Sequence, residues 1–150
     1  MKTMKGLLFY LTTALIFAVS VEANPTINIK QDIFTAINSI DYTSLNILLA
    51  EGSNVDQTNQ QGNTPLMAAA KIGNQRMLDI ILAHNPNIDK HNKAGKTALI
   101  LAAESGQYNV VKMLVAHDAN VAKTDNNGNT ASDLASKFGY QQIVDLLNDM

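Results

Sequence analysis

The chain contains 150 residues, with 11 Lys and Arg, 13 Asp and Glu, and a formal net charge of −2. This balance argues against nucleic acid as a partner, because nucleic-acid-binding proteins gather lysine and arginine on one surface. The sequence has 0 cysteines, which excludes a disulfide framework, a thiolate metal site and a cysteine nucleophile. Its length is typical of one domain.

Residues 1–23 have the pattern of a secretory signal peptide. Lys2 and Lys5 precede an uncharged, mostly apolar stretch, and small or modest residues come before a predicted cleavage point at its end. The stretch Gly6–Val21 is shorter than the roughly 20 apolar residues of a membrane-spanning helix. The sequence therefore predicts export to the periplasm or the extracellular space, with residues 24–150 as the mature chain. The alternative is an uncleaved segment that tethers the protein, and only then is a membrane a partner.

After this segment, one sequence unit recurs at an interval of 33 residues. Its clearest copies are GNTPLMAAAKIGN, GKTALILAAESGQ and GNTASDLASKFGY, which begin at Gly62, Gly95 and Gly128. A second glycine and a threonine keep the same interval, at Gly73, Gly106, Gly139, Thr64, Thr97 and Thr130. A fixed period of this length indicates one supersecondary unit stacked along an axis. The sequence therefore predicts a solenoid.

Residues 28–60 form a weaker first copy. It keeps the apolar spacing of two short helices but lacks the turn glycine and the Thr-Pro-Leu of the next copy. Its apolar residues are Ile33, Ala36, Ile37, Leu45, Leu48 and Leu49. A terminal repeat meets solvent on its outer face, so we expect an N-terminal cap.

The two central repeats, at residues 61–93 and 94–126, contain signals for a turn and two helices. The turn glycine tolerates a positive φ, the threonine caps the next helix, and Pro65 suits its first position. Paired alanines keep the first helix thin, and the second helix has an apolar stripe. The alanines are Ala69, Ala70, Ala102 and Ala103; the stripes are Met77, Leu78, Ile81 and Leu82, then Val110, Val111, Leu114 and Val115.

Residues 127–150 contain a fourth unit, which is more polar than the central ones. Its apolar stripe is Ile143, Val144, Leu146 and Leu147. Polar residues, among them Ser132, Ser136 and Asn148, surround this stripe. We expect a C-terminal cap.

The unit G-x-T-[PA]-L, followed by Ala-Ala, a glycine, an apolar run such as MLDIILA or VVKMLVA, and Asn-[VI]-[DA], resembles the ankyrin repeat. The resemblance covers Asn28 to the C-terminus. It implies an all-α repeat solenoid, in which helix-turn-helix units alternate with β-turn or hairpin loops. It also implies a non-enzymatic scaffold that binds another protein, with no cofactor and no small-molecule substrate. A secreted effector that binds host proteins fits the family as well.

Two positions depart from the ankyrin pattern. Where the first unit has a glycine after its second helix, the next units have Asn85 and Asp118, which tolerate a left-handed conformation best after glycine. The histidine that commonly follows Thr-Pro-Leu is replaced by Met67, Ile100 and Asp133. We expect its hydrogen bond to the capping threonine to be absent, and the array to be less stable than an ideal one.

Few residues suggest catalytic or metal chemistry. His84 and His117 lie one period apart, so a metal site that includes Glu51 is one interpretation, but exposed helix ends are the favoured one. The residues around Asp125 resemble a calcium loop, yet Ser136 stands where that loop needs glutamate. The sequence has no Gly-rich phosphate loop, no G-x-S-x-G elbow and no H-E-x-x-H helix.

The resemblance places partner contacts on the loop tips and on the exposed side of each first helix. By register, the loop positions are Gln60, Gln61, Asn63, Lys93, Lys96, Asn126, Asn127 and Asn129. The helix-end positions are Lys71, Ile72, Glu104, Ser105, Lys137 and Phe138. Ile72 and Phe138 are the strongest candidates, because an exposed apolar side chain can anchor an interface. The alternative is that both cover the core edge and that the amide side chains only form turns.

Overall fold

The computed structural model describes residues 32–150, so the predicted signal segment lies outside the described residues. Within this part, the secondary structure consists of eight helices and no strand. The helices are α2 (Ile33–Asn38), α3 (Tyr42–Ala50), α4 (Pro65–Ile72), α5 (Gln75–Leu82), α6 (Ala98–Glu104), α7 (Tyr108–Ala116), α8 (Ala131–Lys137) and α9 (Gln141–Asn148). None of these helices has both the length and the apolar character needed to cross a bilayer.

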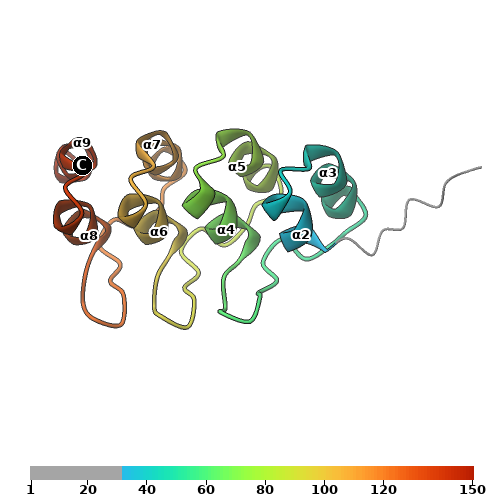
Figure 1. Ribbon diagram of the computed structural model, residues 1–150, viewed down its shortest axis with the longest axis horizontal. Coiled ribbons are helices and arrows are strands. Elements are labelled where there is room, and N and C mark those ends of the chain that lie inside the picture. The colour runs from blue at the N-terminus through green and yellow to red at the C-terminus, as the bar shows by residue number, and fades with distance from the viewer. Residues whose placement is uncertain (1–31) are drawn as a thin grey trace, which may run out of the picture. The chain divides into compact units, whose positions relative to one another are not determined.

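The helices form four consecutive pairs that stand in a row (Figure 1). The first helices contact one another in the order α2, α4, α6 and α8, and the second helices in the order α3, α5, α7 and α9. Between the pairs, long loops project to the same side of the row (Figure 1). This stacking of neighbouring pairs confirms the predicted all-α repeat solenoid.

The helices α4, α6 and α8 each begin at a threonine, as predicted. The hydroxyl of Thr64, Thr97 or Thr130 accepts a hydrogen bond from the backbone N–H three residues later. This bond satisfies one of the donors left unpaired at a helix start. Pro65 occupies the first position of α4, where a missing N–H removes no helical hydrogen bond. The threonines therefore set where each repeat starts.

The histidine bond to the capping threonine is absent as predicted, but in two repeats another side chain bonds the threonine in its place. The Asp133 carboxylate accepts hydrogen bonds from the Thr130 hydroxyl at 2.7 Å and from the Thr130 N–H at 2.8 Å. In α4, the Met67 sulfur accepts one from the Thr64 N–H at 3.4 Å. Both side chains stand at the third helical position, from which an acceptor reaches back to the cap residue. Ile100 has only a hydrocarbon side chain, so it does not replace the bond.

Small side chains let neighbouring first helices lie close together. Ala69 and Ala70 in α4, and Ala102 and Ala103 in α6, are 0% exposed. The two helices contact each other directly. Since no side chain larger than a methyl group stands at these four positions, the helix axes can approach closely. The predicted thin first helix is confirmed.

The apolar stripes of the second helices complete the core. In α5 and α7 the buried stripe residues are Met77, Leu78, Ile81, Leu82, Val110, Val111 and Leu114. Val115, predicted with them, is only partly buried. In α9, Ile143 and Leu147 are buried, whereas Val144 and Leu146 are partly buried. The helix lies at the end of the row (Figure 1), where fewer groups cover it.

Non-glycine residues have a left-handed backbone at three places in residues 32–150. Asn85 has a φ of 51° and Asp118 a φ of 63°, which confirms that both replace glycine as predicted. The third is Ile40, with a φ of 56°. It lies one period before Gly73, where the later repeats all have glycine. A β-branched residue is strained in this region, and the Ile40 side chain is 49% exposed, so little burial offsets the strain.

We predict that Ile40→Gly stabilises the protein. A left-handed conformation costs a residue with a β-carbon about 1–2 kcal/mol, and the added chain entropy of glycine offsets about 0.5–1 kcal/mol of that gain. A rise in melting temperature of about 2–5 °C is expected in a thermal unfolding experiment. Ile72→Gly is the control, because Ile72 is also exposed but lies in a helix, where glycine destabilises. An Ile40→Gly protein that melts lower than wild type would refute the prediction.

Candidate functional site

The same side-chain hydrogen-bonding pattern shapes the loops that precede α4, α6 and α8. Asn59, Asn92 and Asp125 are spaced by one period, and the Oδ1 of each accepts hydrogen bonds from the backbone N–H groups two and four residues later. For Asn92, these donors are Ala94 at 2.9 Å and Lys96 at 3.0 Å. Such bonds replace part of a backbone turn. The loop tips are therefore held in one conformation.

Neighbouring loops are also bonded to one another. The Lys93 N–H donates to the Gln61 carbonyl at 3.2 Å, and the Asn126 N–H donates to the Ala94 carbonyl at 3.0 Å. The Asn92 side-chain amide donates to Asn63 Oδ1 at 2.7 Å. These bonds lie one repeat apart, so they join the loops into a layer beside the first helices. These hydrogen bonds couple each loop to the loop of the neighbouring repeat.

A groove of about 770 Å³ lies at the junction of the second and third repeats. Loop residues and the ends of α4 and α6 line it. It brings together eight of the predicted partner-binding residues, Gln60, Gln61, Asn63, Lys71, Lys93, Lys96, Glu104 and Ser105; Ala94, which register places in the same loop, also lines it, and Asn92 and Leu101 are added. Its volume is in the range of ligand-binding clefts. The predicted positions therefore form one continuous surface between these two repeats.

The groove combines an apolar residue with charged groups. Leu101 is only 6% exposed, yet it is among the lining residues. Lys96 Nζ lies 2.6 Å from Glu104 Oε2, and their side chains are 19% and 27% exposed. In the described part of the chain this is the single ion pair. Partial burial makes such a pair firmer than an exposed one, so the Lys96 and Glu104 side chains are held in place.

The remaining predicted residues lie outside this groove. Asn126, Asn127 and Asn129 lie in the loop between α7 and α8. The Asn129 amide donates to the Asp125 carboxylate at 3.2 Å. The Asn129 amide therefore supports the turn, and the Asn126 amide donates to the Lys93 carbonyl of the neighbouring loop at 3.0 Å.

Ile72 and Phe138 are 43% and 50% exposed, so neither is sealed into the core. The Lys137 ammonium lies 6.0 Å from the centre of the Phe138 ring, at the limit of a cation–π contact. Both apolar residues remain candidates for partner contact outside the groove.

Sequence reasoning missed Asn92 and Leu101. Asn92 stands one period from Asn59 and Asp125, and this spacing was a usable signal. No sequence signal marked Leu101 as a groove residue, because the equivalent residue in the preceding repeat is Ala68 and both fit an apolar helix. Only the packing decides that Leu101 reaches the groove.

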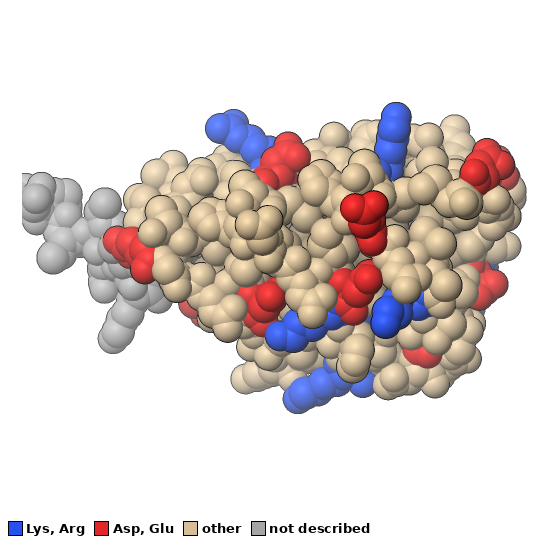
Figure 2. All heavy atoms as spheres, turned by 180° about the vertical axis from the view of Figure 1, so that it is seen from behind, with Lys and Arg blue, Asp and Glu red and all other residues tan. Residues whose placement is uncertain are grey.

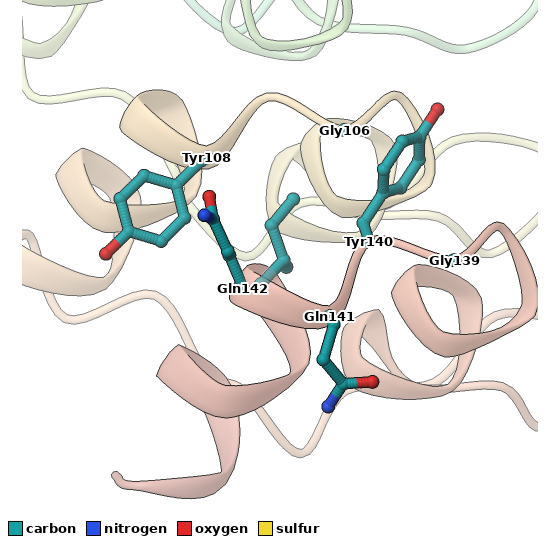
Figure 3. Close-up of a pocket in the computed structure, with 7 residues that line it drawn as sticks. Gly106, Tyr108, Gly139, Tyr140, Gln141 and Gln142 are labelled. Atoms are coloured by element: carbon teal, nitrogen blue, oxygen red, sulfur yellow. The ribbon is translucent and has the colours of Figure 1, made fainter.

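A second, smaller hollow of about 310 Å³ lies where the third and fourth repeats meet. Tyr140 stands beside Gly106, and Tyr108 and Gln142 lie on the other side (Figure 3). A β-carbon at Gly106 would come within 2.7 Å of the Tyr140 ring, so the glycine is what admits the ring. The hollow contains none of the predicted site residues, and its form follows from how the two repeats dock.

No large patch of one charge stands out on the face seen in Figure 2, where acidic and basic side chains alternate. Within residues 32–150, no three His, Cys, Asp or Glu side chains are grouped so that they could hold a metal ion. His117 Nδ1 lies 2.9 Å from the Met113 carbonyl of its own helix, which is the helix-end arrangement favoured above.

The calcium-like segment around Asp125 also has a structural role. The pKa of the Asp125 carboxyl lies below its ordinary value of 3.8, chiefly because the Asn129 N–H donates to it. The Asn129 side chain, the Asn127 N–H and the charge of Lys96 act in the same direction, while burial acts against them. The charged carboxylate is therefore tied into the turn by internal donors.

We predict that Asp125→Asn leaves the turn intact, because Asn59 and Asn92 already hold the equivalent turns. At neutral pH the two melting temperatures should agree within about 2 °C. Since the pKa of Asp125 is lower in the folded state, its contribution is complete above the unfolded value and is lost as the pH falls through the folded value. Wild type should therefore lose stability relative to the variant below pH 3.8.

Thermal unfolding followed by circular dichroism over a pH series tests this. The reverse substitution, Asn59→Asp, is the matched variant, and it should add a similar loss of stability in acid. Parallel pH curves for wild type and Asp125→Asn would show that the turn carboxylate makes no such contribution.

Comparison with known proteins agrees with this geometry. The family model for ankyrin repeats (3 copies) matches residues 33–125 and 91–149. Together the two matches span well over half of the 150 residues and include every residue that lines the groove. No curated protein matches the sequence.

Proposed function

Because the chain belongs to the ankyrin-repeat family, we propose that it is a non-enzymatic module that holds another protein in the groove between its second and third repeats. Ankyrin repeats generally bind proteins, and most ankyrin-repeat proteins lack an enzymatic activity of their own. The observation that supports this site is the convergence of eight register-predicted residues on one groove. Site residues that come from two loops and two helices make one surface only when the repeats are stacked.

The groove is suited to binding because its walls are already ordered. The Asn59 and Asn92 turns hold the two loops, and the backbone bond from Lys93 to Gln61 joins them. A partner therefore binds without having to order these loops, which lowers the entropic cost of association. Leu101 supplies an apolar contact and the rim supplies polar ones, the usual division in a protein interface.

Export is the second part of the proposal. We propose that the protein acts in the periplasm or outside the cell, on the strength of the charged start, apolar stretch and cleavage point in residues 1–23. Its partner then belongs to the same compartment. A membrane-tethered adaptor with an uncleaved segment is the competing form, and an effector that binds host proteins is a special case of secretion.

We predict that Ala94→Trp blocks partner binding. Ala94 lines the groove at an exposed loop tip, so an indole there fills the space that the partner needs. The partner is first identified by cross-linking and mass spectrometry in the exported fraction, and its affinity is then measured. A loss of at least about tenfold is expected, equivalent to about 1.4 kcal/mol.

Ala116→Trp is the control, because Ala116 is also exposed but lies at the end of α7 outside the groove. It should leave the affinity unchanged. Equal affinities for the two tryptophan variants would mean that the partner binds elsewhere.

We predict that the mature protein begins at Asn24. N-terminal sequencing of the protein from fractionated native cells measures this directly. A start at Asn24 in a soluble exported fraction supports export with cleavage. An intact N-terminus in the membrane fraction would contradict cleavage and favour the tethered form.

A further inference from the structure

The hydrogen-bond acceptors of the groove are largely used within the protein. The Glu104 carboxylate accepts from Lys96 Nζ at 2.7 and 2.6 Å. Asn92 Oδ1 accepts two backbone N–H groups, and Asn63 Oδ1 accepts the Asn92 amide. The Glu104 carboxylate and these two asparagine oxygens are therefore already bonded within the protein.

Several hydrogen-bond donors of the groove, in contrast, have no partner within the described residues. Within residues 32–150, the ammonium groups of Lys71 and Lys93 make no ion pair and no hydrogen bond. The side-chain amides of Gln60 and Gln61 make none either, and all four side chains belong to exposed residues. Each glutamine amide offers both a donor and an acceptor, so the surplus of donors on this wall is that of the two lysines, and a partner with acceptors satisfies them.

The charges that line the groove also favour a partner with acceptor groups. Three lysines and one glutamate line the groove, whereas the whole chain has a net charge of −2. Because Lys96 is paired with Glu104, the excess positive charge is that of Lys71 and Lys93. These two residues come from separate elements, Lys71 from the end of α4 and Lys93 from the loop between α5 and α6. Stacking therefore creates a local positive field that the overall composition does not show.

We propose that this groove binds an acidic, extended segment of the partner protein. Its carboxylates pair with Lys71 and Lys93, its peptide groups meet the amides of Gln60 and Gln61, and an apolar side chain contacts Leu101. This inference rests on the proposed function and names the chemistry of its partner. A polypeptide fits better than a bare phosphate, because the wall has no arginine fork and its buried residue is apolar.

The Lys96–Glu104 pair sets how strong this preference is. Glu104 lies on the same wall as the two lysines and repels an acidic ligand. Glu104→Gln removes that repulsion and releases Lys96 to pair with the ligand. The substitution should therefore strengthen the binding of an acidic segment, a gain that a merely structural role for the pair does not produce.

Three fluorescein-labelled octapeptides of alternating sequence, (Glu-Leu)4, (Gln-Leu)4 and (Lys-Leu)4, serve as probes of the full chain in fluorescence anisotropy. Amide chemical shifts in NMR spectra locate the site. We expect (Glu-Leu)4 to bind most tightly, to shift the groove residues, and to weaken as salt is added.

The variants test the named residues. Lys71→Gln with Lys93→Gln should weaken (Glu-Leu)4 about tenfold, since exposed ion pairs contribute about 0.2–1 kcal/mol each and 1.4 kcal/mol is tenfold. Glu104→Gln should strengthen it about threefold. Lys112→Gln with Lys123→Gln is the matched control, because both lysines are exposed and lie outside the groove. It should change the affinity by less than about twofold.

Three results would overturn the inference. If (Gln-Leu)4 binds the groove as tightly as (Glu-Leu)4, the groove accepts peptides without regard to charge, and the proposed function stands while the acidic partner does not. If the control pair weakens binding as much as the groove pair, only the total charge matters. If no peptide shifts the groove residues, the acidic-segment proposal fails, and the Ala94→Trp experiment alone decides whether a folded partner uses the groove.

Discussion

Close contact between the first helices is the constraint on which the rest of this structure depends. It requires side chains no larger than a methyl group, which Ala69, Ala70, Ala102 and Ala103 provide at complete burial. The spacing that results brings each loop within hydrogen-bonding reach of the next, as the bond from the Lys93 N–H to the Gln61 carbonyl shows. The core and the groove are therefore coupled, because a larger residue between the helices would also separate the loops.

Each loop tip is held by a single oxygen atom that accepts two backbone N–H groups. An asparagine side chain does this in the loops that precede α4 and α6, and Asp125 does it in the loop that precedes α8. The neutral and charged versions have the same geometry but differ in their response to acid, since only the carboxylate can be protonated. The two loops beside the groove use the neutral version, so the side chain that shapes each of these turns carries no charge.

Two deviations from the repeat pattern lie in the first and last units. Ile40 takes a left-handed conformation where the other repeats have glycine, and Asp133 binds the capping threonine through a carboxylate. A unit at the end of the row contacts one neighbour instead of two, so fewer contacts select its residues. The central units, which form the groove, keep the turn glycines and the capping threonines but depart from the pattern at Met67, Asn85, Ile100 and Asp118.

The sequence by itself determined the period, the helix starts, the thin first helices and the left-handed residues Asn85 and Asp118, because each follows from local backbone chemistry or from helical spacing. It also identified most of the groove wall, since register places equivalent residues on the same face. It did not determine that Asp133 replaces the missing histidine bond, that Leu101 reaches the groove, or that Glu104 pairs with Lys96 and leaves Lys71 and Lys93 unpaired. Those outcomes depend on which side chains meet when the chain folds back and the repeats stack, and only the tertiary structure decides that.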